Sequence, residues 1–510
     1  MALFETGAKF PPEKSIERLS RYERMRKIFQ NKQWEVYERA AEILKESPQG
    51  QQLRKLYIAI GLADIVSTKP ADMLVGERPR FESGLPDDSE EQKAYTSYVE
   101  ENDLVQLIHE SCMANGYRGD AWIKARYGYR QDYSALKAEG FDIPSDAKME
   151  PIVEHVNASF VFPETSQGNV KKFKAVNIAT VEWVERKKSE DAYLNVERHI
   201  PGYIIYKRFK LHPTGVDTSW FAEISTFDIG EEVDTGRESN LVETGLPFIP
   251  VFHVPYKAVD DDWQGIGGLE KLESVFAAIN DRLVQIDYIL WKHSDPNSYG
   301  PDLEGTDSNS VRFGGVYIPV TKDDVVPGYM TWQAQLDAAF KELDLLISTV
   351  FIMSETPQWL FGTTMSGDNS GGTGTSHTDS SAIKARFMPI LSKVKRIRNH
   401  YDKAIRDALY ACFLFDKQEN DHAWQDVYPS IAWKDGIPRN IKEEAEIASL
   451  RTGGKATQDV QSAIKSLDEV DDEKAKETIQ RIEDDETAAM GTVDSTIFNQ
   501  TTPTTEEATK

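Results

Sequence analysis

The chain has 510 residues, 40% of them hydrophobic, and a formal net charge of −25 at pH 7. This length and composition predict a soluble protein with several domain-sized units. The acidic balance argues against a protein that wraps nucleic acid in a basic surface. No apolar run reaches about 18 residues and the N-terminus is polar, so neither a membrane span nor a secretory signal is expected. The two cysteines, Cys112 and Cys412, stand far apart, which favours reduced buried thiols and folding in the cytosol.

The predicted secondary structure of the N-terminal half changes once, from helical to β-rich. Residues 14–65 carry apolar side chains at intervals of three and four, which predicts helices, and a further helix is expected around 103–116. Residues 150–260 are rich in β-forming segments, and Pro201-Gly202 between two of them is typical of a hairpin. We therefore expect an α+β unit with a mostly antiparallel sheet over residues 1–262.

Two segments with heptad spacing follow, separated by about forty residues in which Gly314-Gly315 suggests a hairpin turn. The first stripe consists of Leu269, Leu272, Phe276, Ile279, Leu283, Ile286 and Leu290, and the second of Leu336, Phe340, Leu343, Ile347 and Val350. Each stripe predicts a helix that buries one face. Since no long coiled-coil partner is evident in the chain, packing in a ring of identical subunits is one closed solution.

Residues 362–381 form a segment in which fifteen of twenty residues are Gly, Ser or Thr. A flexible linker is the default interpretation of such a composition. The segment lies between two strongly apolar helical patterns, however, and a structureless stretch of this length inside a compact body is usually functional or disordered. A long helix follows it, with Pro389 predicted to kink or break the rod.

This long helix is basic in an otherwise acidic chain. Residues 381–410 carry eight cations against Asp402 and Asp407; the cations are Lys384, Arg386, Lys393, Lys395, Arg396, Arg398, Lys403 and Arg406. The local excess indicates either a solvated or internally paired helix face or a surface that contacts a polyanion. The sequence leaves both alternatives open.

The sequence motifs that could indicate a catalytic site are incomplete. GGKAT at 453–457 lacks the first glycine and the Ser/Thr of a phosphate loop, and GIGG at 265–268 lacks the third glycine of a dinucleotide fingerprint. The run Asp260–Asp262 could serve a metal-dependent nuclease or phosphotransferase, although an acidic loop before a helix explains it more plainly. We therefore predict no catalytic residue, no metal and no cofactor.

Several blocks together resemble portal proteins of tailed double-stranded DNA bacteriophages, particularly long-tailed phages of Gram-positive hosts. The blocks are KPADMLVGERPRFES (69–83), ANGYRGDAWIKARYG (114–128), residues 243–281 with their acidic loop and glycine-led helix, TPQWLFGT to SAIKARF (356–387), and residues 443–486. They follow the order of the family along nearly the whole chain. Each block is degenerate, and the resemblance depends on their sum.

The resemblance implies a multi-domain portal fold. Its parts would be a wing over 1–262, a stem helix at 263–293, a clip at 294–332, a second stem helix at 333–361, a tunnel loop at 362–381, a long kinked helix at 382–420, a helical crown at 421–490 and a disordered tail at 491–510. The tunnel loop would face DNA through Thr363, Thr364, Ser366, Asp368, Asn369, Ser370, Thr373, Ser376 and His377. The basic helix would lie near the same tunnel.

The resemblance also implies a function without catalysis. Portal proteins form a ring, normally of twelve copies, at one capsid vertex of the virion, and assemble in the host cytoplasm. Such a ring nucleates head assembly with capsid and scaffolding proteins, docks the terminase large subunit, conducts double-stranded DNA without sequence preference, and joins the head to the tail through a head-completion adaptor. Another head–tail connector protein remains an alternative, although adaptors are typically much shorter.

Overall fold

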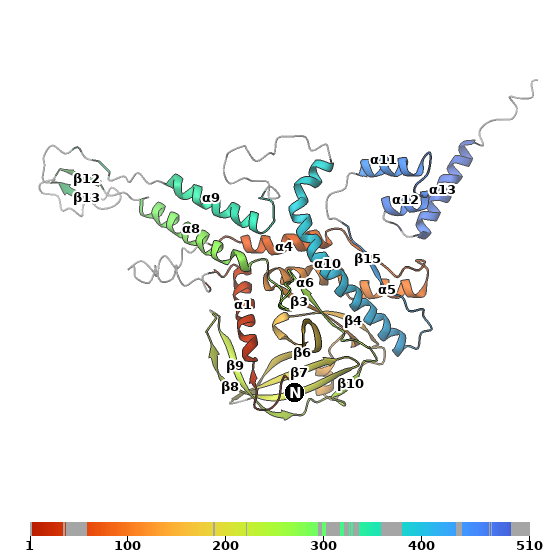
Figure 1. The fold of residues 1–510 in the computed structure, drawn as a ribbon, viewed down its shortest axis with the longest axis horizontal. Helices are drawn as coiled ribbons and strands as arrows, with labels where there is room; N and C mark the ends of the chain where they lie inside the picture. Colours follow the sequence, from red (N-terminus) through yellow and green to blue (C-terminus); the bar gives the residue numbers. More distant parts are fainter. Residues whose placement is uncertain are drawn as a thin grey trace, which may run out of the picture. The chain divides into compact units, whose positions relative to one another are not determined.

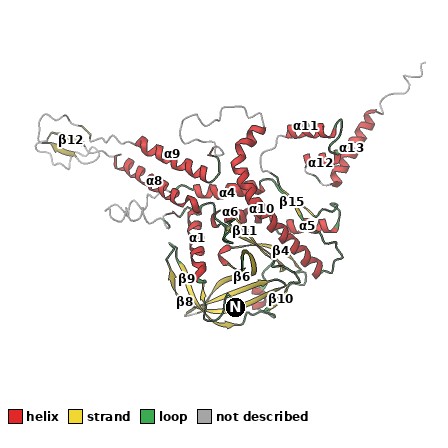
Figure 2. Ribbon diagram, in the orientation of Figure 1, coloured by secondary structure: helices red, strands yellow, loops and turns green. Residues whose placement is uncertain are grey.

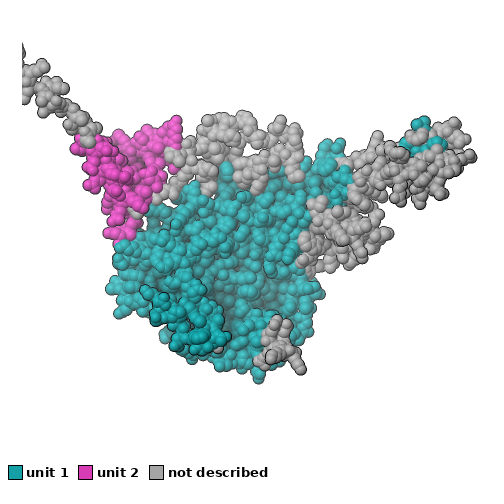
Figure 3. All heavy atoms as spheres, turned by 180° about the vertical axis from the view of Figure 1, so that it is seen from behind, with its two compact units in different colours: residues 1–84, 90–436 teal, residues 85–89, 437–510 magenta. Residues whose placement is uncertain are grey.

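The computed structural model describes residues 3–33, 36, 59–186, 189–220, 222–293, 298–301, 317–320, 326, 328–329, 336–358, 380–434, 441–468, 470 and 472–490. The chain divides into two compact units (Figure 3). Unit 1 comprises residues 1–84 and 90–436, and unit 2 comprises residues 85–89 and 437–510. Within the described ranges, no helix is both long and apolar enough to cross a bilayer.

Helices and strands are mixed in unit 1, which confirms the predicted α+β class (Figure 2). Its described α-helices are α1 Glu13–Phe29, α4 Leu62–Val75, α5 Glu90–Glu101, α6 Leu104–Arg118, α7 Ser134–Ala138, α8 Glu273–His293, α9 Leu336–Met353 and α10 Ser380–Glu419. Short 3₁₀ turns occur at η3 Ala158–Phe160 and η4 Glu270–Leu272.

The largest sheet is antiparallel throughout the described residues and has seven strands in the order β1-β9-β8-β7-β6-β5, with β10 paired to β8. The strands are β1 Lys9–Phe10, β5 Val161–Ser166, β6 Asn169–Arg186, β7 Ser189–Ile200, β8 Tyr203–Asp217, β9 Ile224–Val233 and β10 Leu241–Glu243. Ile200 pairs with Tyr203 across the two-residue turn, and Gly202 adopts φ +85° there, which confirms the predicted hairpin. One face of the sheet buries Phe162, Leu194 and Phe209.

A second sheet has the order β11-β3-β4 and consists of β3 Asp120–Tyr129, β4 Met149–Val156 and β11 Val251–Pro255. Helices α4, α5, α6 and α10 share a hydrophobic core with this sheet, in which Tyr401, Ile405 and Leu409 of α10 are fully buried. The smaller described sheets are β2 Arg80–Glu82 with β15 Ser430–Ala432, and β13 Tyr317–Val320, β12 Ser298–Pro301 and β14 Gly328–Tyr329.

Helices α8 and α9 lie side by side and project from the sheets as a pair (Figure 1). The glycine-led segment was expected to open the first of them, yet α8 begins only at Glu273, after η4. Residues 265–268 stay out of the helix because their backbone amides bond to side chains and carbonyls of other elements. In the residues between the pair, β13 runs parallel to β12, and Gly314-Gly315 lies outside the described residues.

Helix α10 runs without a break through Pro389. The proline removes one helical hydrogen bond, and because Pro389 is exposed, water can satisfy the carbonyl that it leaves without an amide. The chain after α10 folds back onto unit 1, where Trp424 stacks on Phe413 and β15 pairs with β2. The C-terminal compact unit therefore begins at residue 437, later than the expected boundary at 421.

Unit 2 contains the helices α11 Ile441–Thr452, α12 Val460–Leu467 and α13 Asp472–Met490. Asp459 caps α12 by accepting a hydrogen bond from the Ser462 amide at 2.8 Å. Lys465 pairs with Asp472 at 2.8 Å and with Asp87 of the 85–89 segment at 2.9 Å, which explains why this segment belongs to unit 2. Residues 491–510 lie outside the described residues.

Candidate functional site

The segment that leads into α8 is pressed against the turn between α6 and β3. Tyr256 N donates to Gly119 O at 2.8 Å, and Gly268 N donates to Gly116 O at 2.7 Å. A Cβ at Gly265 would lie 2.1 Å from Gly119 O, so only glycine allows this approach. Gly119 itself ends α6 with φ +90°. The glycines of GIGG therefore serve backbone packing at the base of α8.

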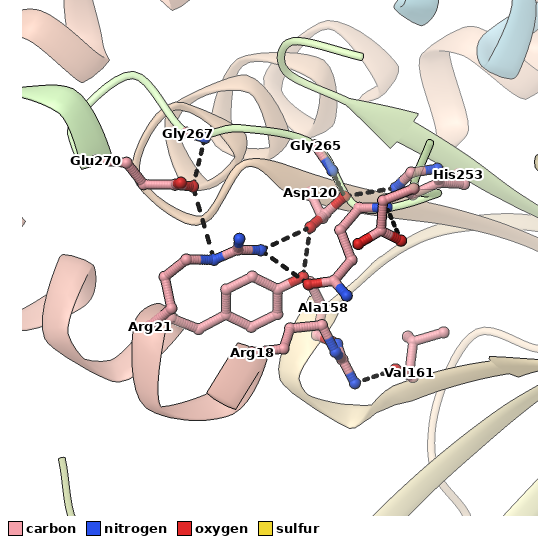
Figure 4. Close-up of polar contacts among 12 residues, drawn as sticks. Arg18, Arg21, Asp120, Ala158, Val161, His253, Gly265, Gly267 and Glu270 are labelled. Atoms are coloured by element: carbon pink, nitrogen blue, oxygen red, sulfur yellow. Dashed lines mark hydrogen bonds and ion pairs between the residues drawn. The ribbon is translucent and has the colours of Figure 1, made fainter. Parts of the chain in front are cut away.

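A buried carboxylate, Asp120, holds this segment in place (Figure 4). Its Oδ1 accepts from Gly265 N at 2.7 Å and lies 2.7 Å from His253 Nε2, while its Oδ2 accepts from Tyr22 Oη at 2.5 Å. The Asp120 side chain has no exposed surface. Burial, together with the Asp120 charge, raises the pKa of Tyr22 well above its usual value, so the phenol remains a donor. One carboxylate thus ties α1, β3, β11 and the start of α8 together.

A second carboxylate, Glu270, completes this arrangement. Its Oε1 accepts from Gly267 N at 2.6 Å and lies 3.7 Å from Arg21 Nε. Arg21 also approaches Asp120 at 3.9 Å and donates to Gln264 Oε1 at 3.1 Å. We call the set Tyr22, Arg21, Asp120, His253, Gly265, Gly267 and Glu270 the polar junction. The polar junction fixes the N-terminal end of α8 to the rest of unit 1 through partly or fully buried charged side chains.

The acidic run 260–262 lies just before the polar junction but does not join it. Asp260 and Asp261 are exposed, and Asp262 Oδ1 accepts from Gln264 N at 3.3 Å, which is a local turn contact. Within the described residues, no group of three or more His, Cys, Asp or Glu side chains is placed to hold a metal ion.

The heptad stripes of α8 and α9 are buried largely inside the chain. Leu269, Leu272, Phe276, Ile279 and Ile286 are at most 6% exposed, Leu283 is partly buried, and Leu343 and Ile347 are at most 5% exposed. Val350 is fully buried, whereas Leu290 and Phe340 are 49% and 46% exposed, so these two positions of the stripes are not buried within the chain. The Leu336 side chain lies outside the described residues.

The partners of these stripes are residues of α1 and α4, such as Met25, Ile28 and Val66. Helices of the same chain therefore cover most of both stripes, and their burial does not require a ring of identical subunits. Apolar side chains that remain exposed on the pair are Leu290, Phe340, Leu345, Ile352 and Met353.

The basic residues of α10 divide into two groups. Lys393 is 5% exposed, and Arg398 donates to Lys434 O at 2.6 Å beside the Trp433 ring, so these two cations are structural. Lys395 and Arg396 are exposed, and Arg396 pairs with Glu355 at 2.5 Å. The side chains of Lys384 and Arg386 lie outside the description, as do all the DNA-facing candidates from Thr363 to His377.

Sequence reasoning missed the two most informative polar groups, Asp120 and buried Lys393. Asp120 directly follows Gly119, which ends α6, and no sequence motif surrounds it. Lys393 is one of several cations whose pattern is typical of a solvent-exposed helix face. For Lys393, one sequence signal was present in the distant helix α4, where Pro70 leaves a carbonyl without a donor.

Residues 330–492 match the family model described as phage portal protein, SPP1 Gp6-like. The match supports a phage portal protein. It covers about a third of the chain, including α9, α10 and all of the described helices of unit 2. The resemblance to portal proteins is thereby confirmed over these residues. No curated protein matches the chain.

Proposed function

We propose that this chain is the subunit of a portal ring at the unique vertex of a phage capsid. The ring, normally of twelve copies, nucleates head assembly, docks the terminase motor, conducts DNA into and out of the head, and joins the head to the tail. The proposed role is structural and requires no chemical reaction. The match of residues 330–492 to the portal family is the observation that carries the proposal.

The construction of the α8/α9 pair supports this role. A stem that transmits force between a motor and a capsid needs a fixed base. The polar junction provides it for α8, since Asp120 and Glu270 bind the amides of Gly265 and Gly267 directly. The exposed apolar residues Leu345 and Ile352 of α9, at 66% and 76% exposure, offer area for contacts between neighbouring copies.

The negative net charge of the chain supports a role as a conduit that does not bind DNA tightly. Non-specific DNA affinity rises steeply with the number of phosphate–cation contacts, so a chain with net charge −25 favours sliding over binding. Of the basic residues on α10, we propose that Lys395 and Arg396 lie near the DNA path, because their side chains are exposed. The segment 362–381 would contact DNA through its small hydroxyl-bearing residues.

The remaining partners follow from the same proposal. The clip, residues 294–332, would contact the terminase large subunit and later the head-completion adaptor. The wing, residues 1–262, would contact capsid and scaffolding proteins. The assembled ring would reside in the virion.

Native mass spectrometry of the purified full chain tests the ring. Twelve copies of 57.7 kDa make about 690 kDa, and closed cyclic assembly predicts one dominant species near that mass. A replacement of residues 364–376 by a short Gly-Ser segment should leave this species intact while reducing the DNA content of phage heads. Loss of the assembled species in that variant would instead assign the segment a structural role.

A further inference from the structure

Lys393 of α10 is a buried lysine that joins three helices. Its Nζ donates to Ser354 O at 2.9 Å, at the end of α9, and to Val66 O at 3.5 Å, inside α4. The residue is 5% exposed, and both acceptors are neutral carbonyls. Buried lysines are rare because removing an ammonium from water is unfavourable, so this placement needs a physical reason.

The reason is that both carbonyls have lost their helical donors. In α4, the partner of the Val66 carbonyl would be the amide of residue 70, and Pro70 has no N–H. At the end of α9, Glu355 adopts φ +56° and donates to Ile352 O at 3.2 Å, while Thr356 N donates to Phe351 O at 3.1 Å.

This pattern at the end of α9 is a Schellman ending, which satisfies the carbonyls of Phe351 and Ile352. Within the described residues, the Ser354 carbonyl receives only side-chain donors, Lys393 Nζ at 2.9 Å and the Thr356 hydroxyl at 3.3 Å. The Lys393 side chain thus supplies the donor that Val66 O lacks in α4 and the shorter of the two hydrogen bonds to Ser354 O after α9.

Titratable side chains occur on the elements packed around this lysine. Glu355 follows α9 and is paired with Arg396 of α10. The thiol of Cys112 comes from α6, and the Tyr256 ring, after β11, lies 5.9 Å from Nζ. On α4, Asp72 is engaged with Lys69 and His109. The Lys393 ammonium is therefore surrounded by carbonyl dipoles and an aromatic ring. The nearby anion that acts on it most strongly, Glu355, is paired with Arg396.

We propose that Lys393 is a protonation-sensitive joint that holds the C-terminal end of α9 against α4 and α10, and that its positive charge makes this joint easier to open near neutral pH than at alkaline pH. The inference concerns contacts within one chain and goes beyond the proposed portal function, on which it does not depend. It assigns Lys393 a positioning role for the point at which the chain leaves α9.

The direction of the pH effect follows from linkage. Burial, reinforced by Arg396 and opposed by Glu355 and Cys112, lowers the pKa of Lys393 to about 8 from its usual value of 10.5. The closed joint therefore binds fewer protons than the open one between these values, and raising the pH favours the closed form. The opening equilibrium constant should fall roughly 70-fold between pH 7 and pH 10.

The test measures opening as the labelling rate of a buried thiol. Thr356→Cys places the thiol at a position that is 1% exposed, and Ile352→Cys on the same helix end, at 76% exposure, gives the rate for a free thiol at each pH. The ratio of the two iodoacetamide rates reports opening, and peptide mapping separates the label from the buried Cys112 and Cys412. Ser354→Cys, at 6% exposure, is a second probe if Thr356→Cys disturbs the fold.

Three backgrounds complete the experiment. With Lys393 present, the ratio should fall roughly 70-fold from pH 7 to pH 10. In Lys393→Met it should change less than about threefold, because the buried ammonium, whose protonation the closed joint disfavours, is gone. In Lys395→Met, an exposed matched control on the same helix, it should follow the parent. If Lys393→Met does not fold, Lys393→Gln provides a second non-titrating side chain, with the same expected flat response.

A flat or rising ratio in the parent chain would overturn the proposal. So would an equal fall in Lys393→Met, or labelling of Thr356→Cys as fast as Ile352→Cys at every pH. The decisive comparison, Lys393→Met against the parent, uses the same two probes in the same assembly state. Any ring contact at Ile352 then affects both chains alike, so failure of the joint and failure of the portal assignment remain distinguishable.

Discussion

Removing the central carboxylate of the polar junction should destabilise unit 1 strongly. In Asp120→Ala, the Gly265 amide, the Tyr22 hydroxyl and the His253 ring all lose an acceptor that lies 2.5–2.7 Å away. Each hydrogen bond to a charged group contributes about 1.5–3 kcal/mol, and their losses do not add fully because water and side chains relax. We expect the free energy of unfolding to fall by about 3–5 kcal/mol, the cost of breaking a buried charged network.

Urea unfolding followed by tryptophan fluorescence measures this change. Trp122 and Trp263 lie 4.7 and 5.4 Å from the His253 ring, so two of the ten tryptophans of the chain stand at the junction. Asp261→Ala is the matched control, because Asp261 is an exposed aspartate next to the same segment and should change the free energy by less than about 0.5 kcal/mol. If Asp120→Ala unfolded within 1 kcal/mol of this control, our account of how α8 is anchored would be refuted.

Two further changes test other parts of the fold. Burial, reinforced by Arg118, lowers the pKa of His155 to about 4. The stability that the neutral imidazole contributes is therefore fully present above pH 6.5 and is lost as the pH falls toward 4. Between pH 7 and pH 4, the free energy of unfolding of His155→Gln should fall by about 3 kcal/mol less than that of the parent, as measured by urea unfolding at each pH. Two positions of the α8 stripe should differ in their cost: Phe276→Ala, at 2% exposure, should lower the free energy of unfolding by about 3–5 kcal/mol, and Leu290→Ala, at 49% exposure, by less than about 1 kcal/mol. Equal costs would show that Phe276 is not buried in the core.

Hydrophobic periodicity and turn residues in the sequence were sufficient to predict much of the fold. The stripe containing Phe276 predicts α8, the one containing Leu343 predicts α9, and Pro201-Gly202 predicts the hairpin between β7 and β8. These features depend on neighbours a few residues apart, so the sequence displays them directly. The helix break allowed at Pro389 did not occur, because an exposed proline costs one hydrogen bond that water can replace.

The sites were much harder to predict, since they depend on residues that meet only in the folded chain. Asp120 and Gly265 are 145 positions apart, and Lys393 and Val66 are 327 apart. Nothing near Lys393 in the sequence distinguishes it from its exposed neighbour Lys395. The burial of the α8 stripe inside the chain was likewise hidden, because its partners, such as Met25, come from a helix 250 residues earlier.

Negative-stain electron microscopy of the purified full chain tests the central claim most directly. The portal assignment requires closed rings with an axial hole, and a heterologous interface between identical copies gives such a ring when its rotation closes. We expect ring-shaped particles in end views, predominantly with twelve-fold symmetry. Particles that remain single copies at every protein concentration, without rings, would contradict the assignment.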